Sequence, residues 1–173
     1  MNIPAPKKEE LSNYYQSYLG YLTEQNLLDA LNSQSNVTSK FISGLTEEQA
    51  NYAYAPGKWS IKEVIGHLCD TERILVYRAL RIARKDLTPI EGFDENWYIP
   101  NSNYSLRSLS GIFKEWQAIR LATQAFFSNI DASMAEYSGT ANSTPVTVKA
   151  LLYFIIVHER HHLKVLQERY LNS

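Results

Sequence analysis

A four-helix bundle is the fold class that this sequence predicts, on three observations. In four long segments, apolar residues recur at the three- and four-residue spacing of a helix, and no segment keeps the strict alternation of a surface strand. Two Ser/Thr-x-x-Glu/Gln sequences mark the starts of helices. Residues 86–104, rich in Pro, Gly and Asn, separate the second and third segments and leave room for one long crossover loop. The predicted class is therefore all-α.

Residues 1–22 form an N-terminal arm ahead of the first long segment. We expect its tyrosine rings, at positions 14, 15, 18 and 21, to pack against the rest of the chain. A first long helix is predicted from after Thr23 to near Gly44, because leucines and isoleucines recur there at helical spacing. Thr46 and Gln49 then form a capping box that opens a short helical turn.

The second long helix is predicted to begin at the Ser60-Ile61-Lys62-Glu63 capping box and to run to about Lys85. After the crossover loop, Ser105 is expected to cap a third helix that ends near Ile130. Residues 138–145, rich in Ser, Thr, Gly, Asn and Pro, are interpreted as an irregular connection.

Composition narrows the classes of function. The chain has 173 residues, 45% of them apolar and 20% charged, which suits one soluble domain over residues 1–173. A formal net charge of -1 offers no concentrated basic face for nucleic acid or an anionic membrane. The apolar run 151–157 is too short to span a bilayer, and the first residues lack the apolar core of a secretory signal. We therefore expect a cytoplasmic protein.

Thr147 is expected to cap a fourth helix that reaches Tyr170, and this helix carries most of the chemistry. Three of the four histidines of the chain lie within residues 158–162. On a helix, His158 and His162 fall within about 20° of the centre of the apolar stripe, whereas His161 falls about 80° away, at its edge. Two buried imidazoles are costly without partners, and a shared metal ion removes that cost. The alternative is two core histidines, each hydrogen-bonded to a carbonyl or carboxylate.

His67 supplies a third candidate ligand from the second helix. It lies about 60° from Val64, to one side of the apolar stripe, as a residue lining a cleft between two helices would. We therefore predict a metal site of His67, His158 and His162, with His161 outside the ligand set. Three protein ligands leave a coordination position open for water or substrate.

The residues from His158 to His162 also match H-E-x-x-H, the signature of zinc peptidases. The match is interpreted as accidental, because Glu159 points about 80° away from the His158–His162 axis. Val165 stands where a metzincin has its turning glycine, and Glu168 where it has its third histidine. The residues after His162 are also too few for a second ligand helix.

Three stretches of the sequence resemble the DinB-like superfamily. They are YAPGKWSIKEVIGHLCDTERILVYRALRIARKD (54–86), GFDENWYIP (92–100) and the terminal HERHHLKVLQERY. The most specific marks are W-S-x-x-E-x-x-x-H-L, at residues 59–68, and the final H-x-x-x-H pair, and the similarity covers roughly residues 20–173. The resemblance implies an up-down-down-up bundle, often dimeric. It also implies a divalent metal held by one histidine of the second helix and two of the last, here His67, His158 and His162.

The resemblance also suggests chemistry, since characterised members include S-transferases that use low-molecular-weight thiols and proposed metal-dependent hydrolases. The expected function is a metal-dependent enzyme that acts on a small molecule, by thiol S-transfer or hydrolysis, with Zn or Ni as the metal. A low-molecular-weight thiol would be a possible cosubstrate, and a homodimer the expected assembly. No side chain is an obvious general base. The alternative function is a non-catalytic bundle that binds a metal or small ligand.

A few further residues carry predictions. Glu72 falls inside the apolar stripe of the second helix, so we expect an ion pair with an arginine such as Arg120, or else a hydrogen bond to a metal-bound imidazole. Cys69 is expected to be inert. Trp97 and Tyr98 are core or rim aromatics that could instead form the floor of a pocket. A basic run is expected on a solvated face or a dimer contact: Arg73, Arg78, Arg81, Arg84 and Lys85.

Overall fold

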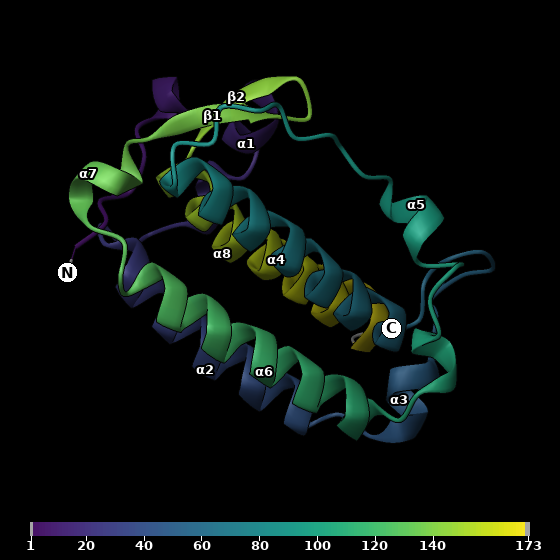
Figure 1. Ribbon diagram of the computed structural model, residues 1–173. Helices are drawn as coiled ribbons and strands as arrows, with labels where there is room; N and C mark the ends of the chain where they lie inside the picture. The colour runs from purple at the N-terminus through teal and green to yellow at the C-terminus, as the bar shows by residue number, and fades with distance from the viewer. Residues whose placement is uncertain (1, 172–173) are drawn as a thin grey trace.

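Four long helices form a bundle in the computed structural model, which describes residues 2–171. They are α2 (Leu27–Ser43), α4 (Ile61–Ala83), α6 (Leu109–Phe127) and α8 (Val148–Val165). Helices α2 and α8 run in one direction, and α4 and α6 run in the other (Figure 1). The predicted four-helix bundle with its up-down-down-up order is confirmed.

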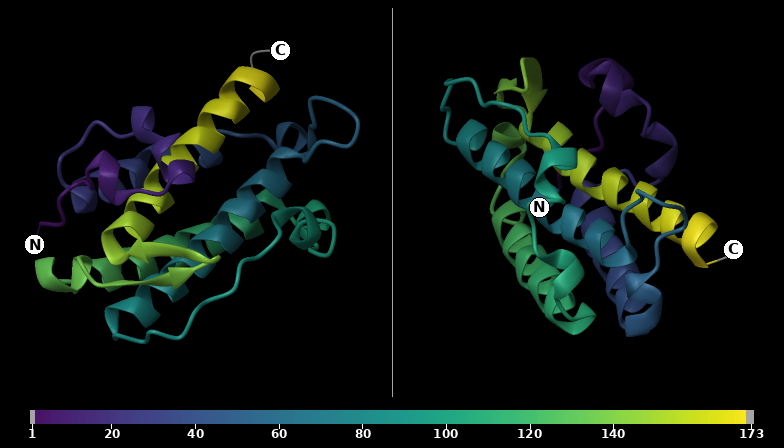
Figure 2. Two further views of the ribbon diagram at one scale, coloured as in Figure 1. Left: turned by 90° about the horizontal axis from the view of Figure 1, so that it is seen from above. Right: turned by 90° about the vertical axis from the view of Figure 1, so that its right-hand side faces the viewer.

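The order of packing explains the long crossover. Helix α4 packs against both α8 and α6, and α2 packs against the same two helices. Because α4 and α6 are neighbours that run in the same direction, the chain between them must return along the whole length of the bundle (Figures 1 and 2). It does so through an extended segment that contains α5 (Glu95–Tyr98) and a short 3-10 turn, Tyr104–Leu106.

Capping residues begin the helices as the sequence indicates, with one correction. The capping boxes at Ser60 and at Thr46 are both formed, the latter at the start of α3 (Glu47–Asn51), and Thr147 caps α8. The prediction for α6 was wrong by one turn. Ser105 lies inside the 3-10 turn, and it is Ser108 that caps α6, its Oγ accepting a hydrogen bond from the Gly111 amide over 3.1 Å.

The predicted irregular connection contains a β-hairpin that the sequence reasoning missed. Strands β1 (Ser138–Ala141) and β2 (Thr144–Thr147) pair antiparallel, after the short helix α7 (Ala132–Ala135). Asn142 and Ser143 form the two-residue turn at φ 50 and φ 57, the left-handed backbone that such hairpin turns require. Strands of four residues with a proline in one of them have too little alternation to be recognised from sequence.

The N-terminal arm packs its rings on the bundle, as predicted. It consists of three short turns, Lys8–Glu10, Asn13–Gln16 and Leu19–Tyr21. The ring of Tyr15 stacks on Phe154 of α8, with centroids 4.2 Å apart. Tyr18 meets the same phenylalanine edge-on at 5.3 Å. The arm therefore covers the outer side of α8 beside α4 (Figure 2).

The last helix changes character near its end. Helix α8 has regular α geometry to Val165, and residues Leu166–Leu171 continue as a π-helical segment that packs Leu166 and Tyr170 into the core. The Tyr170 hydroxyl donates to the carbonyl oxygen of Trp59 over 2.9 Å, which ties this segment to the start of α4.

Among the helices of residues 2–171, none combines the length and the apolar character that crossing a bilayer requires.

Candidate metal centre

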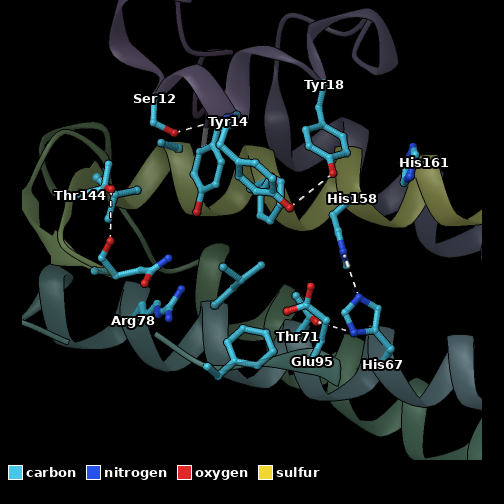
Figure 3. Close-up of a pocket in the computed structure, with 18 of the residues that line it drawn as sticks. Ser12, Tyr14, Tyr18, His67, Thr71, Arg78, Glu95, Thr144, His158 and His161 are labelled. Carbon is cyan, nitrogen blue, oxygen red and sulfur yellow. Dashed lines mark hydrogen bonds between the residues drawn. The ribbon is translucent and has the colours of Figure 1, made fainter. Parts of the chain in front are cut away.

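Three imidazole rings meet between α4 and α8. His67 lies in the second turn of α4, and His158 and His162 lie one turn apart on the facing side of α8. Nε2 of His158 is 3.2 Å from Nε2 of His67 and 3.1 Å from Nε2 of His162. Figure 3 shows the His67 and His158 rings pointing toward one another across the gap between the helices. One nitrogen from each of the three residues lies within 4.8 Å of the other two.

Local contacts hold the His67 ring in this position. The hydroxyl of Thr71, one turn further along α4, lies 3.4 Å from its Nδ1. The Trp59 ring packs against the imidazole with centroids 5.1 Å apart. Contacts of this kind fix the orientation of a histidine that presents its other nitrogen to a ligand.

Burial keeps the three histidines neutral. It lowers the pKa of His67 to about 4. It lowers the pKa of His162 to about 3, and the neighbouring imidazoles of His67 and His161 add to the effect. For His158, burial and then the His162 and His67 rings bring the pKa well below its ordinary value. Neutral imidazole is the form that binds metals.

The donor set fits a cation. A neutral imidazole nitrogen either donates one hydrogen bond or accepts through one lone pair. Nε2 of His158 faces two other ring nitrogens. It can therefore form a good hydrogen bond with only one of them at a time. A divalent ion between the rings would accept a lone pair from all three, as zinc does in three-histidine sites.

His161 lies outside this group. Its Nδ1 is 3.1 Å from the hydroxyl of Tyr21, and its ring meets the Tyr18 ring edge-on at 5.4 Å. The predicted helical register, which set His161 apart from His158 and His162, therefore agrees with the structure. The partners of this ring in the structure are tyrosines of the arm.

Glu159 points away from the histidines into the bundle, where it is 1% exposed. Its carboxylate accepts hydrogen bonds from Trp116 Nε1 over 3.0 Å, from the Thr38 hydroxyl over 2.7 Å and from Arg120 Nη2 over 2.6 Å. With both oxygens occupied by buried donors, this residue cannot serve as the general base of a peptidase. The H-E-x-x-H match is therefore accidental, as predicted.

The same arginine is the predicted partner of Glu72. Arg120 Nε donates to Glu72 Oε1 over 3.0 Å, and Nη2 donates to Oε2 over 2.8 Å. The expected ion pair is confirmed, and the alternative of a hydrogen bond to an imidazole is not found for the described residues. Glu159 is the second acid of this network, which the sequence did not reveal because its angle on α8 placed it only at the edge of the apolar stripe.

A cavity of about 540 Å³ opens beside the three histidines. Helices α4 and α8 form its sides, the tyrosines of the arm cover it, and the crossover and the hairpin close it further along (Figure 3). The histidines lie at one end. The residues of the arm, crossover and hairpin that line it include Tyr14, Tyr15, Tyr18, Phe93, Glu95, Asn142 and Thr144.

The structure corrects two predictions about this cavity. Trp97 is 69% exposed and Tyr98 is also exposed, so neither lies in the core, and the alternative of a pocket floor is wrong as well; Phe93 and Glu95 of the same loop line the cavity instead. Arg78 is not on a solvated face, because it is buried and lines the cavity. One part of the signal was present in the sequence, namely the helical face of Arg78. This residue follows His67 by eleven positions, three turns of helix, and so shares its face.

Cys69 is buried, as expected for an inert side chain. Burial raises the pKa of its thiol well above the ordinary value, which disfavours the reactive thiolate.

Unlike Arg78, two other members of the predicted basic run have acidic neighbours at the surface. Arg73 pairs with Glu115 over 2.6 Å, and Arg81 pairs with Asp86 over 2.6 Å.

Comparison with known proteins gives consistent results. A protein of Oceanobacillus iheyensis named "Putative metal-dependent hydrolase" is 26% identical over 143 residues, which cover 79% of each chain. A protein of the same name from Geobacillus kaustophilus is 27% identical over 129 residues, or 70% of this chain and 69% of the relative.

A solved structure shares the fold. It is YfiT from Bacillus subtilis, described as a probable metal-dependent hydrolase with an unusual four-helix bundle topology. The two structures superpose with a TM-score of 0.74 over 96% of this chain and 91% of that one, at 16% sequence identity. The family described as the DinB superfamily matches residues 30–166, which span all four long helices and the three converging histidines. This chain therefore belongs to the DinB superfamily.

Proposed function

We propose that the protein is a metal-dependent enzyme that binds a divalent ion through His67, His158 and His162 and acts on a small molecule in the adjoining cavity. The observation that carries the proposal is the convergence of three neutral imidazoles at one end of a 540 Å³ cavity. Three protein ligands leave at least one coordination position for a reactant. When bound, such an ion polarises a substrate oxygen or lowers the pKa of a coordinated water or thiol.

The chain itself supplies the surroundings of the reaction. The rings of Tyr14, Tyr15, Tyr18 and Phe154 line the cavity and would exclude water from a bound molecule. Glu95 is half-buried and lines the cavity at the end where His67 and Thr71 lie (Figure 3). We propose that its carboxylate accepts a proton from the attacking group there, a role for which the sequence offered no obvious residue.

Hydrolysis is the first candidate reaction, because the named relatives are described as metal-dependent hydrolases. Transfer of a low-molecular-weight thiol is the second, since it uses the same activation of a nucleophile. Three imidazoles suit Zn or Ni, which we propose as the metal. A non-catalytic metal-binding bundle is the alternative function.

Elemental analysis of untagged protein, followed by assays of ester and amide hydrolysis and of thiol transfer with added Zn²⁺ or Ni²⁺, tests the proposal. We expect about one metal ion per chain and turnover that disappears in His67→Ala. Metal bound by the wild type without turnover on any of these substrates would favour the non-catalytic alternative. A wild-type protein that binds neither ion would refute the metal site.

We further propose that the protein is a homodimer, as the resemblance to the superfamily implied. Light scattering during size-exclusion chromatography would then give twice the mass of the 19.9 kDa chain. A mass of one chain at micromolar concentration would contradict the dimer without affecting the metal proposal.

A further inference from the structure

Arg78 is a buried cation at the far end of the cavity from the histidines. It is 6% exposed and lines the cavity. Figure 3 shows it beside the hairpin residue Thr144 at one end, with His67 and His158 at the other. A buried guanidinium is costly unless a partner compensates its charge.

The partners of Arg78 leave most of its capacity unused. A guanidinium has five N–H donors. Within residues 2–171, one hydrogen bond from it is found, from Nη2 to the carbonyl oxygen of Glu91 over 3.0 Å. Its Nε is buried without a hydrogen-bond partner. The Phe93 ring lies 5.9 Å from its central carbon and provides a weak cation–π contact.

No carboxylate neutralises this cation in the part of the chain that the structure describes. The ion pairs among residues 2–171 involve other arginines and lysines. Arg120, the other deeply buried arginine, has two carboxylates, Glu72 and Glu159. Within residues 2–171, Arg78 thus keeps a charge that a bound molecule could compensate.

The position of Arg78 on α4 relates it to the metal centre. His67, Thr71 and Arg78 line one face of the helix, and eleven residues separate the first from the last. At 1.5 Å per residue, their backbones lie about 16 Å apart along the helix axis. A molecule that reached both ends of the cavity would therefore be extended.

We propose that Arg78 is a carboxylate-binding residue and that the substrate has a carboxylate at one end and its reacting group at the other. The assignment of this carboxylate to a substrate rests on the proposed function at the three histidines. Nη1 and Nη2 form the tip of a guanidinium, which can bind a carboxylate through two parallel hydrogen bonds, and no hydrogen bond from Nη1 is found within residues 2–171.

A carboxylate fits better than a phosphate because of the other charges. Among the lining residues within 2–171, Arg78 is the one lysine or arginine, while Glu10 and Glu95 are acidic. Lys149, which does not line the cavity, neutralises Glu10 over 2.7 Å. One free cation balances a single negative charge, whereas a doubly charged phosphate would face the remaining acid with one charge uncompensated.

Saturation-transfer NMR titrations test this subsite with hexanoate and with hexanamide, a neutral ligand of the same length and shape. Full-length wild type, Arg78→Met and Arg78→Lys are compared, once with one equivalent of Zn²⁺ and once with EDTA. Arg84→Met is the matched control, because Arg84 is exposed at the end of the same helix. Inorganic phosphate is added as a competitor of hexanoate.

We expect wild type and Arg84→Met to bind hexanoate at least about tenfold more tightly than hexanamide, with and without Zn²⁺. The reason is that hexanamide cannot form the hydrogen bonds between a carboxylate and the charged guanidinium. Arg78→Met should lose this preference, and Arg78→Lys, which keeps the charge without the planar edge, should keep part of it. Hexanoate should resist displacement by equimolar phosphate.

Two results would overturn the subsite. Equal binding of the two ligands by wild type would do so even if Arg78→Met failed to fold. A preference that requires Zn²⁺ and survives in Arg78→Met would place the carboxylate on the metal, supporting the proposed function while refuting the role of Arg78. A preference for hexanoate in EDTA, in a protein that never binds metal, would keep the subsite and refute the proposed function.

Discussion

Neighbouring residues of α8 have different partners because successive side chains of a helix point about 100° apart. His158 and His162 face His67 and the cavity. Glu159, between them in sequence, contacts Arg120 and the bundle core. Arg160 reaches back to the N-terminal arm, where its Nη1 donates to the Tyr21 carbonyl oxygen over 2.8 Å, and its Nη2 donates to Glu24, just after the arm, over 2.7 Å. One short segment therefore connects the candidate metal site, the core and the arm.

Single replacements of the four histidines test which residues bind metal. We expect His67→Ala, His158→Ala and His162→Ala to weaken Zn²⁺ binding by at least about a hundredfold, because two imidazoles hold the ion poorly. His161→Ala should keep most of the affinity, since this ring contacts Tyr21 instead. Competitive titration with a coloured chelator measures all four. Loss of metal in His161→Ala with retention in His162→Ala would refute the ligand set.

Glu159→Gln should destabilise the fold without removing the metal. An amide cannot accept hydrogen bonds through its nitrogen, so donors of Arg120 and Trp116 would lose acceptors in the core. Breaking a buried pair in this way costs about 3 kcal/mol of unfolding free energy. Urea denaturation measures the loss, with the exposed Glu168→Gln as the control. Unchanged stability with loss of Zn²⁺ affinity would instead indicate a role for Glu159 at the site.

At the scale of elements, the crossover loop is attached to α4 through a close approach at Gly66. A Cβ on this glycine would collide with the ring of Tyr104, whose hydroxyl donates to Asp70 over 2.8 Å. The residue of α4 that lies under the loop is thus a glycine, and its lack of a side chain lets the Tyr104 ring approach the helix backbone. This contact holds the crossover at the start of α6.

Gly66→Ala should therefore destabilise the protein by about 1–3 kcal/mol through overpacking, although the same change in an open helix stabilises by about 1 kcal/mol. Without the Tyr104 ring there is nothing for the new methyl group to collide with. Gly66→Ala made in a Tyr104→Ala background should therefore leave the stability unchanged or raise it. Chemical denaturation of the two single variants and the double variant measures this coupling. A stabilising Gly66→Ala in the otherwise wild-type protein would show that the loop does not lie against α4.

The segment between the arm and α2 is tied to α8 by an ion pair of Glu24 with Arg160, whose strength should depend on pH. The Arg160 guanidinium lowers the pKa of Glu24 from 4.5 to about 2. Because the folded pKa lies below the unfolded one, the pair stabilises the fold above about pH 4.5 and loses this contribution as the pH falls toward 2. Since Glu24 is partly exposed, its contribution should be about 1 kcal/mol.

Glu24→Gln should accordingly be about 1 kcal/mol less stable than wild type at pH 7, with a difference that shrinks between pH 4.5 and the acid limit. Urea unfolding at pH 7, 5, 4 and 3 follows the trend, and the exposed Glu9→Gln provides the control. A difference that is constant over this range would mean that the carboxylate charge does not hold this segment against α8.

For the whole molecule, the three histidines connect the two helices that form the sides of the cavity. An ion bound there would cross-link α4 to α8 in the folded state, and unfolding would release it. Free Zn²⁺ at a hundred times its dissociation constant should add about 2.7 kcal/mol, or roughly 5–10 °C in melting temperature for a chain of this size. Differential scanning fluorimetry measures the shift. It should be absent in His158→Ala and with Mg²⁺, which prefers oxygen ligands; an equal shift in His158→Ala would contradict the site.

Much of the fold was predictable because it depends on neighbours in sequence. The apolar period of 61–83 and 148–165 specified two long helices, and the Ser60 and Thr147 caps specified where they begin. Helical spacing also placed His158 and His162 on one face and turned Glu159 away from it. These features need no knowledge of any other segment.

The remaining features depend on which distant segments come together, and local pattern carries no signal for that. Whether Arg78 is a surface charge or a buried cation is decided by the crossover and the hairpin that cover it, more than ten residues away in the chain. Glu95 enters the cavity because the crossover returns along α4, and the arm closes the same cavity because Tyr15 finds Phe154. The sequence by itself determined the helices and the face on which the histidines lie. Only the tertiary structure decided that this face borders a cavity with a buried charge at its far end, since the cavity exists only where the arm, α4, the crossover, the hairpin and α8 meet.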